Sequence, residues 1–312
     1  MPAQHLSSPG DRRHGDPSHG TLLSVSEPWS VAWSRALYGH DGFFIRERPL
    51  DHFRTSVANP LFAEAMRELA HRVDDALGLP DPFDVVDVGA GGGELLGRFT
   101  DVPARWRLTN VDVERSGRFS AIPSVTGLLV ANEWLDAIPL DVLIDGRLVR
   151  VSPSGQEMLG PPTASLWGDR WWPGARRVED GSPRDAAWTH AVSRVRRGLA
   201  VAVDYGHDIG SRRATLTGYR AGRQVPPVPD GSCDLTAHVA LDSCAAATGA
   251  RLLTQREALT WLGVSAALPT GGPTFATDLQ RASRASELLD PDGWGGFGWL
   301  VQAVGVPDLL PR

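Results

Sequence analysis

Hydrophobic and polar positions follow two different periods along this chain. Between residues 60 and 77, Leu61, Leu69 and Val73 recur at helical spacing, which predicts an amphipathic helix that ends at Gly78. Short apolar runs then alternate with polar segments, a pattern typical of a mostly parallel sheet with helices on both faces. Strands are expected at 83–88, 107–112, 127–131, 199–204, 251–254 and 298–304, and a helix is expected to open at 94–99. The pattern therefore predicts an α/β fold.

Two regions depart from this alternation. Residues 1–27 are rich in Ser, Pro, Gly, His and Arg without periodicity, so we expect a disordered tail ahead of a single domain at 28–312. That domain opens with a helical segment at 28–38. Residues 140–185 contain a hairpin signal around Asp145 and many Trp and Pro residues. We interpret them as an inserted cap subdomain, packed over the edge of the sheet or over its cleft.

The composition is that of a globular protein and excludes several kinds of partner. With 312 residues, of which 42% are hydrophobic and 22% charged, the chain can bury a substantial core. The net charge of −6 argues against nucleic acid as the main partner. No apolar run approaches the length of a membrane span and no secretory signal opens the chain, so we expect no membrane partner and a cytoplasmic location.

Two residue types limit the chemistry. All cationic side chains are arginine, so lysine cannot act as a nucleophile or base. The two cysteines, Cys233 and Cys244, lack metal-ligand spacing, and we expect free thiols and no metal site.

The most informative stretch is the glycine-rich loop that follows the first expected strand. Asp87, Gly89, Gly91 and Gly93 form the pattern D-x-G-x-G-x-G. Glycine at alternate positions lets the backbone turn sharply and approach a ligand closely. The G-x-G-x-x-G pattern of nicotinamide dinucleotide sites does not fit, because Glu94 stands where the last glycine belongs. The spacing instead resembles motif I of class I S-adenosylmethionine (SAM) methyltransferases.

A site of this kind needs a second acid, at the end of the next strand, to bind the ribose hydroxyls. It is expected about 20 residues after the glycines. Asp112 stands there, at the point where the apolar run stops, and Glu114 is the alternative.

Polar residues also follow the strand expected at 127–131. Asn132 and Glu133 come directly after it, and Asp136 lies about one helical turn beyond Glu133. Ligands of open α/β sheets sit beyond the carboxyl ends of the strands, so these side chains are candidates for catalysis. Asn132 could instead cap a helix, and Glu133 could instead pair with an arginine of the insertion.

Two later runs complete the pattern. His207 ends a buried strand and is a candidate proton acceptor, whereas Asp234 could be only a helix cap. Together the motifs resemble the MidA family of SAM-dependent methyltransferases, whose mitochondrial relatives are arginine methyltransferases that assist assembly of respiratory complex I. The chain departs from many relatives at Gly92, where they carry Arg, and at Gln224, where His is expected. The matching runs are residues 38–44, 52–56, 86–96, 131–139, 204–207 and 234–239.

The resemblance implies a Rossmann-like class I methyltransferase fold with a mostly parallel seven-stranded sheet. It also implies that SAM is the cofactor, held by the three loop glycines with Asp112 on its ribose. Asn132 and Glu133 would then lie near the point of methyl transfer.

We therefore expect a SAM-dependent methyltransferase that acts on a protein arginine side chain. An arginine guanidinium stays protonated, so a carboxylate must bind and orient it. Glu133 is the first candidate for this carboxylate and Asp136 the second. The departing proton would pass to a carboxylate or to His207. Thr55 and Ser56 belong to the segment that, with the insertion, is expected to recognise the acceptor. Two alternatives stay open, a scaffold that binds SAM without turnover and a small-molecule methyltransferase, and the oligomeric state is not indicated.

Overall fold

The computed structural model describes residues 26–47, 55–113, 120–307 and 309–310. Most of the tail expected at 1–27 lies outside these residues, as does Glu114, the alternative ribose ligand. Glu27 is described and belongs to strand β1 (Glu27–Pro28), so the expected tail boundary is set too late. Strand β1 pairs with a strand of the insertion, which the local sequence does not indicate.

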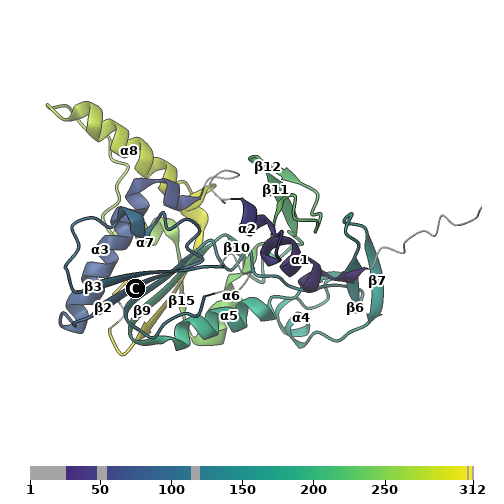
Figure 1. Cartoon of the computed structure of the whole chain (residues 1–312). Coiled ribbons are helices and arrows are strands. Elements are labelled where there is room, and N and C mark those ends of the chain that lie inside the picture. The colour runs from purple at the N-terminus through teal and green to yellow at the C-terminus, as the bar shows by residue number, and fades with distance from the viewer. Residues whose placement is uncertain (1–25, 48–54, 114–119, 308, 311–312) are drawn as a thin grey trace, which may run out of the picture.

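A six-stranded sheet forms the centre of the molecule (Figure 1). Its order is β15-β16-β9-β4-β2-β3, in which β3, β2, β4 and β9 pair in parallel and β16 runs antiparallel to both of its neighbours. All six match strands that the sequence predicts. They are β2 (Phe83–Val88), β3 (Trp106–Val111), β4 (Val125–Asn132), β9 (Val195–Asp204), β15 (Arg251–Thr254) and β16 (Gly298–Val304).

The seventh strand implied by the resemblance does not occur among the described residues, and β3 forms one edge of the sheet. The chain passes from Val111, at the end of β3, to Val125, at the start of β4, through a segment too short for another strand and a crossover helix. The expected seven strands are therefore a wrong prediction, whereas the mostly parallel pairing is confirmed.

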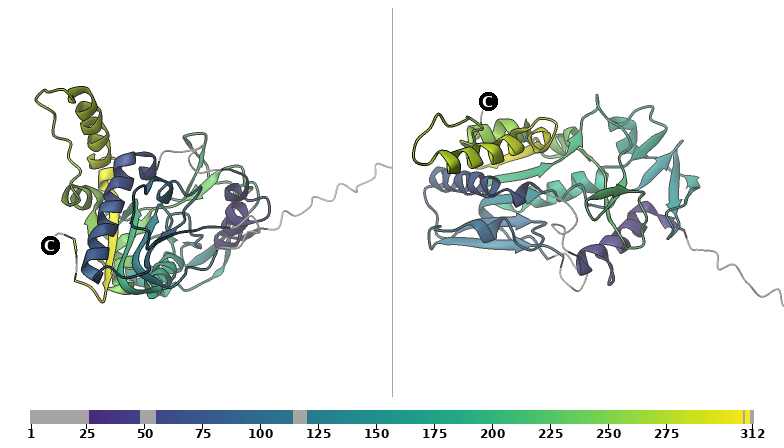
Figure 2. Two further views of the ribbon diagram at one scale, coloured as in Figure 1. Left: turned by 60° about the vertical axis from the view of Figure 1, so that its left-hand side comes forward. Right: turned by 90° about the horizontal axis from the view of Figure 1, so that it is seen from above.

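Helices cover both faces of this sheet (Figure 2). Successive strand residues point to opposite faces, so Val85 and Val201 pack under one layer and Val86 and Ala200 under the other. Helix α3 ends at a left-handed Gly78, as its sequence predicts, and Asn59 caps its start. The first layer is α3 (Pro60–Leu77), α7 (Gln255–Trp261) and α8 (Phe275–Leu289); the second is α5 (Ser182–Ser193) and α6 (Leu241–Thr248).

The helix expected to open at 94–99 is absent, and a turn with the short 3₁₀ helix η3 (Leu96–Arg98) takes its place. Gly91 and Gly93 have φ angles of +56° and +82°, which lie outside the helical region. The Glu94 side chain then folds back and accepts a hydrogen bond of 2.9 Å from the Gly92 N–H. The glycines that make the loop open thus also prevent the helix from starting there.

The insertion forms a separate sheet beside the N-terminal helix α1 (Trp29–Tyr38), at the other end of the molecule from α3 (Figure 1). Its central hairpin turns at Asp145 and Gly146, both with positive φ, as the Asp-Gly signal predicts. The insertion strands and helix are β5 (Val142–Ile144), β6 (Arg147–Val151), β7 (Glu157–Pro162), α4 (Leu166–Trp171) and β8 (Arg177–Glu179).

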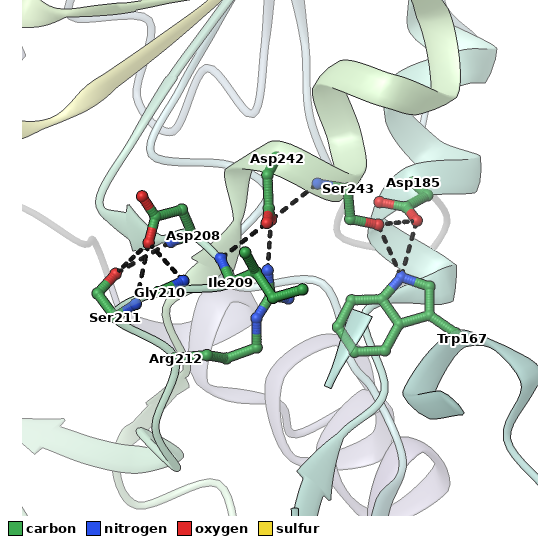
Figure 3. Close-up of polar contacts among 9 residues, drawn as sticks. All are labelled: Trp167, Asp185, Asp208, Ile209, Gly210, Ser211, Arg212, Asp242 and Ser243. Atoms are coloured by element: carbon green, nitrogen blue, oxygen red, sulfur yellow. Dashed lines mark hydrogen bonds and ion pairs between the residues drawn. The ribbon is translucent and has the colours of Figure 1, made fainter. Parts of the chain in front are cut away.

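A polar cluster attaches the insertion to the main body (Figure 3). The indole Nε1 of Trp167 in α4 donates 2.8 Å hydrogen bonds to Asp185 of α5 and to Ser243 of α6. Nearby, the side chain of Arg212 is 2% exposed, forms an ion pair with Asp242 and lies over the Trp167 ring. These contacts fix α4 against the two helices of the second layer.

Shorter elements complete the fold. Strand β10 pairs in parallel with β14, and β11 lies between β12 and β13. In the part of the chain that the structure describes, no helix has the length and apolar character needed to cross a bilayer. The remaining elements are α2 (Phe43–Arg46), η2 (Ser56–Ala58), β10 (Gly206–His207), β11 (Thr217–Arg220), β12 (Arg223–Val225), β13 (Asp234–Thr236), β14 (Val239–Ala240) and η4 (Trp294–Gly296).

Candidate active site

A cavity of about 380 Å³ lies beyond the carboxyl ends of β2, β4 and β9, within the size range of small-molecule sites. This is the place where open α/β sheets bind their ligands. The cavity brings together seven of the residues singled out from the sequence: Thr55, Asp87, Gly89, Gly91, Asn132, Glu133 and Asp136. The other lining residues are Phe44, Val57, Ala90, Glu94, Leu95, Ala137, Tyr205, Tyr219, Asp234, His238 and Phe297.

The glycine loop forms a cradle that only glycine permits. Gly89, Gly91 and Gly93 all have positive φ angles. A Cβ atom on Gly89 would lie 2.8 Å from Cδ1 of Trp134, and one on Gly93 would lie 2.6 Å from Nδ2 of Asn110. Gly93 does not itself line the cavity; it lets the backbone turn behind the two glycines that do.

Asp112 lies in an adjoining hollow, which shares Gly89, Gly91 and Glu133 with the cavity. Its carboxylate accepts hydrogen bonds from the backbone N–H of Val113, at 2.6 Å, and from that of Gly91. Burial raises the pKa of the Asp112 carboxyl, and these two bonds oppose the rise.

Asp87 lies inside the main cavity at the end of β2. Burial, followed by the negative charges of Asp112 and Glu94, raises the pKa of its carboxyl to about 7. The loop is therefore surrounded by three acids and suits a ligand that carries positive charge and hydroxyl groups.

Glu133 has a strained backbone at the end of β4. Its φ angle is +49°, unusual for a residue with a side chain and commonest at functional sites. Oε1 accepts hydrogen bonds from Ser56 N (2.9 Å), Ser56 Oγ (3.1 Å) and Asn132 Nδ2 (3.2 Å). Burial raises the pKa of its carboxyl to about 7, although the bonds to Ser56 lower it.

The alternative interpretations of these two residues do not fit the structure. Among the described residues no arginine pairs with Glu133, so the expected alternative of an ion pair to the insertion does not occur. Asn132 is the last residue of β4 rather than a helix cap, and its Oδ1 accepts a 2.8 Å hydrogen bond from Ser56 Oγ. Ser56 itself does not line the cavity but holds both side chains.

Asp136 and Asp234 form the far wall of the cavity. Asp136 Oδ2 accepts a 2.7 Å hydrogen bond from Thr236 Oγ1 and another from the Tyr205 hydroxyl. Oδ1 of Asp136 and Oδ1 of Asp234 are buried, with no partner within the described part of the chain. Burial, followed by the charge of Asp136, raises the pKa of Asp234 well above its usual value. Asp234 belongs to strand β13, so it is not the helix cap that its sequence allowed.

The structure places His238, rather than His207, at the cavity. His207 is buried beside the rings of Trp172 and His238, and neither of its ring nitrogens has a hydrogen-bond partner among the described residues. Burial, reinforced by Arg212, lowers its pKa to about 4. The imidazole of His238 stands edge-on to the Tyr205 ring, with centroids 5.3 Å apart.

Several lining residues were not singled out from the sequence. Tyr205 and His238 lie within two of the runs that match the family, 204–207 and 234–239. Their place in these runs could have identified them as candidate site residues. Tyr219 comes from hairpin β11–β12, and nothing in the local sequence indicates that this hairpin reaches the cavity. The expected cap, residues 140–185, contributes no lining residue among those described; the hairpin takes that position instead.

Comparisons with known proteins agree with this geometry. Residues 100–256 match the model of a family described as "Putative S-adenosyl-L-methionine-dependent methyltransferase". A COG1565 superfamily member from Burkholderia thailandensis, crystallised with S-adenosyl-homocysteine, superposes with a TM-score of 0.71 at 24% identity, over 91% of this chain and 89% of that one. A native structure of a COG1565 superfamily protein from the same organism gives a TM-score of 0.71 at 20% identity with the same coverage. No match was found among curated proteins.

Proposed function

The chain belongs to this family of S-adenosyl-L-methionine-dependent methyltransferases, and on that premise we propose that its methyl acceptor is the guanidinium group of a protein arginine. The observation that carries the proposal is the charge of the cavity. Glu133, Asp136 and Asp234 are carboxylic acids that line one buried space, and no arginine lines it in the part of the chain described. Buried acids of this kind are neutralised by protonation or by a bound cation, and an acceptor guanidinium supplies such a cation.

We propose that the glycine loop and its acids hold the cofactor. Gly89 and Gly91 let the backbone of the loop approach the cofactor closely, and a Cβ atom at Gly89 would clash with the Trp134 side chain and so displace the loop. The carboxylate of Asp112 suits the ribose hydroxyls, and Asp87 suits a positively charged part of the cofactor. When bound, SAM supplies an electrophilic methyl group on a cationic sulfur.

The acceptor side is suited to a planar, permanently charged donor. A guanidinium presents several N–H groups in a fixed fork, which matches carboxylates that can accept two parallel bonds. Asp136 and Asp234 each keep one buried oxygen that has no partner among the described residues, and both side chains line the cavity. Phe44 and Phe297 line the same space and exclude water from it.

Glu133 is then the residue that orients the attacking nitrogen. Its Oε1 is fixed by Ser56 and Asn132, so the carboxylate has little freedom to turn. A pKa of about 7 lets the same carboxylate receive a proton near neutral pH. Holding the guanidinium in one orientation converts a bimolecular encounter into an aligned reaction.

The test is methyl transfer to a lysate from cells that lack the gene, with labelled SAM, followed by hydrolysis of the proteins to amino acids. We expect the label in methylarginines. Label in methyllysine or in the small-molecule fraction would contradict the proposed acceptor and favour the corresponding alternative. Intact SAM binding without transfer to any fraction would favour a scaffold.

A further inference from the structure

Arg184 is a buried arginine that packs against the wall of the cavity without lining it. It lies in the first turn of α5, and its side chain is among the largest that are fully enclosed, with a residue exposure of 1%. Arginine is rarely enclosed to this degree unless its charge is compensated.

Among the described residues, the Arg184 guanidinium donates its hydrogen bonds to backbone oxygens and not to a carboxylate. It donates to four backbone carbonyls: NH2 to Asp136 O at 2.6 Å, NH1 to Ala237 O at 2.8 Å and to His238 O at 2.9 Å, and Nε to Ile138 O at 3.3 Å. No ion pair to Arg184 occurs among the described residues. One planar fork therefore joins two chain segments, 136–138 and 237–238.

Both segments carry side chains of the acceptor side of the cavity. Asp136 and Ala137 line it from the first segment, and His238 lines it from the second, close after Asp234. Within the described part of the chain, the one backbone hydrogen bond between the two segments is the long one from Ala237 N–H to Asp136 O, at 3.3 Å. The fork of Arg184 thus ties the backbones of the two segments together, in addition to the side-chain hydrogen bond from Thr236 to Asp136.

The charge of Arg184 also acts on the groups around it. Burial lowers its own pKa, and the carboxylates of Asp136, Asp204 and Glu179 oppose that change. Burial raises the pKa of Asp204 well above its usual value, and the charge of Arg184 opposes that rise. Oδ2 of Asp204 accepts hydrogen bonds from the backbone N–H groups of Leu135 and Asp136. The titratable and charged groups that face Arg184 are Tyr38, Asp136, Glu179, Asp204, His207, His238 and Cys244.

We propose that Arg184 is a positioning residue for methyl transfer, which holds the 136–138 and 237–238 segments in register through backbone carbonyls and places a buried positive charge near Asp136 and Asp204, behind the wall of the cavity. For the acceptor itself this inference rests on the proposed function. The effect of its charge on Asp204 is a property of the protein alone and is tested without an acceptor.

The experiment separates charge from shape with two variants and a matched control. R184K keeps the charge but loses the fork, and R184Q loses both. Arg212 is the control, because its side chain is equally enclosed but is held by Asp242 and the Trp167 ring, away from the cavity. The measurements are the binding of N-acetylarginine amide as a function of pH, SAM affinity, and the titration of the Asp204 carboxyl by ¹³C NMR.

In R184Q we expect probe affinity to fall at least about 10-fold, the midpoint of its pH dependence to rise, and Asp204 to titrate at higher pH. R184K should lose a similar fold in probe affinity because the fork is absent, yet keep the wild-type midpoint and Asp204 titration. SAM affinity should stay within about 2-fold of wild type in both. R212K and R212Q should change none of the three.

Wild-type probe affinity in folded R184K, or the same Asp204 titration in R184Q and R212Q, would overturn the inference. If R184Q does not fold, the probe affinity of R184K still tests the inference. A different result would show that the proposed function is wrong while the role of the Arg184 charge stands. Wild-type protein would then fail to bind the guanidinium probe, but Asp204 would still titrate at higher pH in R184Q than in wild type.

Discussion

Ser56 gives two hydrogen bonds to one oxygen of Glu133, from its N–H at 2.9 Å and from its hydroxyl at 3.1 Å, across 77 residues of chain. These bonds hold Glu133 Oε1 in place. Because a carboxylate is planar, they also limit the directions in which Oε2 can point. They also lower the pKa of the Glu133 carboxyl, against the larger effect of burial. The segment just before α3 therefore sets both the orientation and the charge of the acid at the end of β4.

Ser56→Ala should slow methyl transfer and move its pH dependence. Loss of the hydroxyl removes the one proton that Glu133 Oε1 and Asn132 Oδ1 share, an interaction worth about 1–2 kcal/mol, and the rate should fall about 5- to 20-fold. Because the bond from Ser56 lowers the pKa of Glu133, its loss should raise that pKa above about 7. The carboxylate form then appears later as pH rises, so the acid limb of the rate profile should move to higher pH. An unchanged limb would show that Ser56 is only structural.

Gly91→Val should abolish SAM binding. Gly91 has a φ angle of +56°, which a β-branched side chain cannot adopt without strain, and the new side chain would fill the cradle. Gly97→Val is the matched control, since no atom lies within 4 Å of a Cβ built there. Calorimetry should detect binding in the control but not in Gly91→Val. Equal affinity in both folded variants would place the cofactor elsewhere.

Asp112→Ala should weaken SAM binding by about 1.5–3 kcal/mol, the value of a hydrogen bond to a charged group. The Asp112 carboxylate accepts a hydrogen bond from the Gly91 N–H, at the place where we expect the ribose to bind. Its removal should leave the ribose hydroxyls without an acceptor. The dissociation constant measured by calorimetry should rise accordingly. Normal affinity would exclude Asp112 and leave Glu114 as the acid to test.

Glu133→Gln should stabilise the protein without ligand at pH 8. The folded-state pKa of Glu133 is raised from 4.5 to about 7, so below pH 4.5 its carboxyl is neutral in both states and costs nothing. As pH rises through 7, the folded protein must bury a charge that the unfolded chain carries in water. Gln avoids this penalty, which is at most about 3 kcal/mol for a shift of this size.

Urea unfolding at pH 8 and pH 4.5 measures this effect, which should be present only at the higher pH. Glu157→Gln is a control of opposite sign, because Arg177 and Trp29 lower the pKa of Glu157 below its usual value. That variant should be less stable than wild type at pH 8. A Glu133→Gln protein that is no more stable than wild type at pH 8 would mean that Glu133 is solvated or paired.

The strands in the middle of the central sheet were predictable because each contains an apolar run that is buried on both faces, as β4 and β9 illustrate. The clustering of Asp87, Asn132 and Glu133 followed from the rule that parallel strands end at one edge. The predictions failed where contacts between distant parts of the chain determine which residues reach the cavity. Hairpin β11–β12 brings Tyr219 to the cavity through pairing with β13, and no local pattern encodes that contact.

The expected role of His207 shows the same limit. Its position at the end of a buried strand resembles that of a catalytic residue, but the structure encloses it between Trp172 and His238. The two histidines lie 31 positions apart, and only the pairing of β10 with β14 decides which one reaches the cavity. Sequence analysis did not identify Arg184 for a related reason, since its hydrogen-bond partners among the described residues are all backbone carbonyls.

The most direct test of this account is the rate of single-turnover methyl transfer by Glu133→Gln, measured beside its affinity for SAM. Gln keeps the shape of the side chain and an oxygen for the bonds from Ser56, but it loses the charge that orients a guanidinium. We predict that the rate falls about 100- to 1,000-fold while SAM affinity stays within about 2-fold of wild type. A wild-type rate in a folded Glu133→Gln protein would contradict the account.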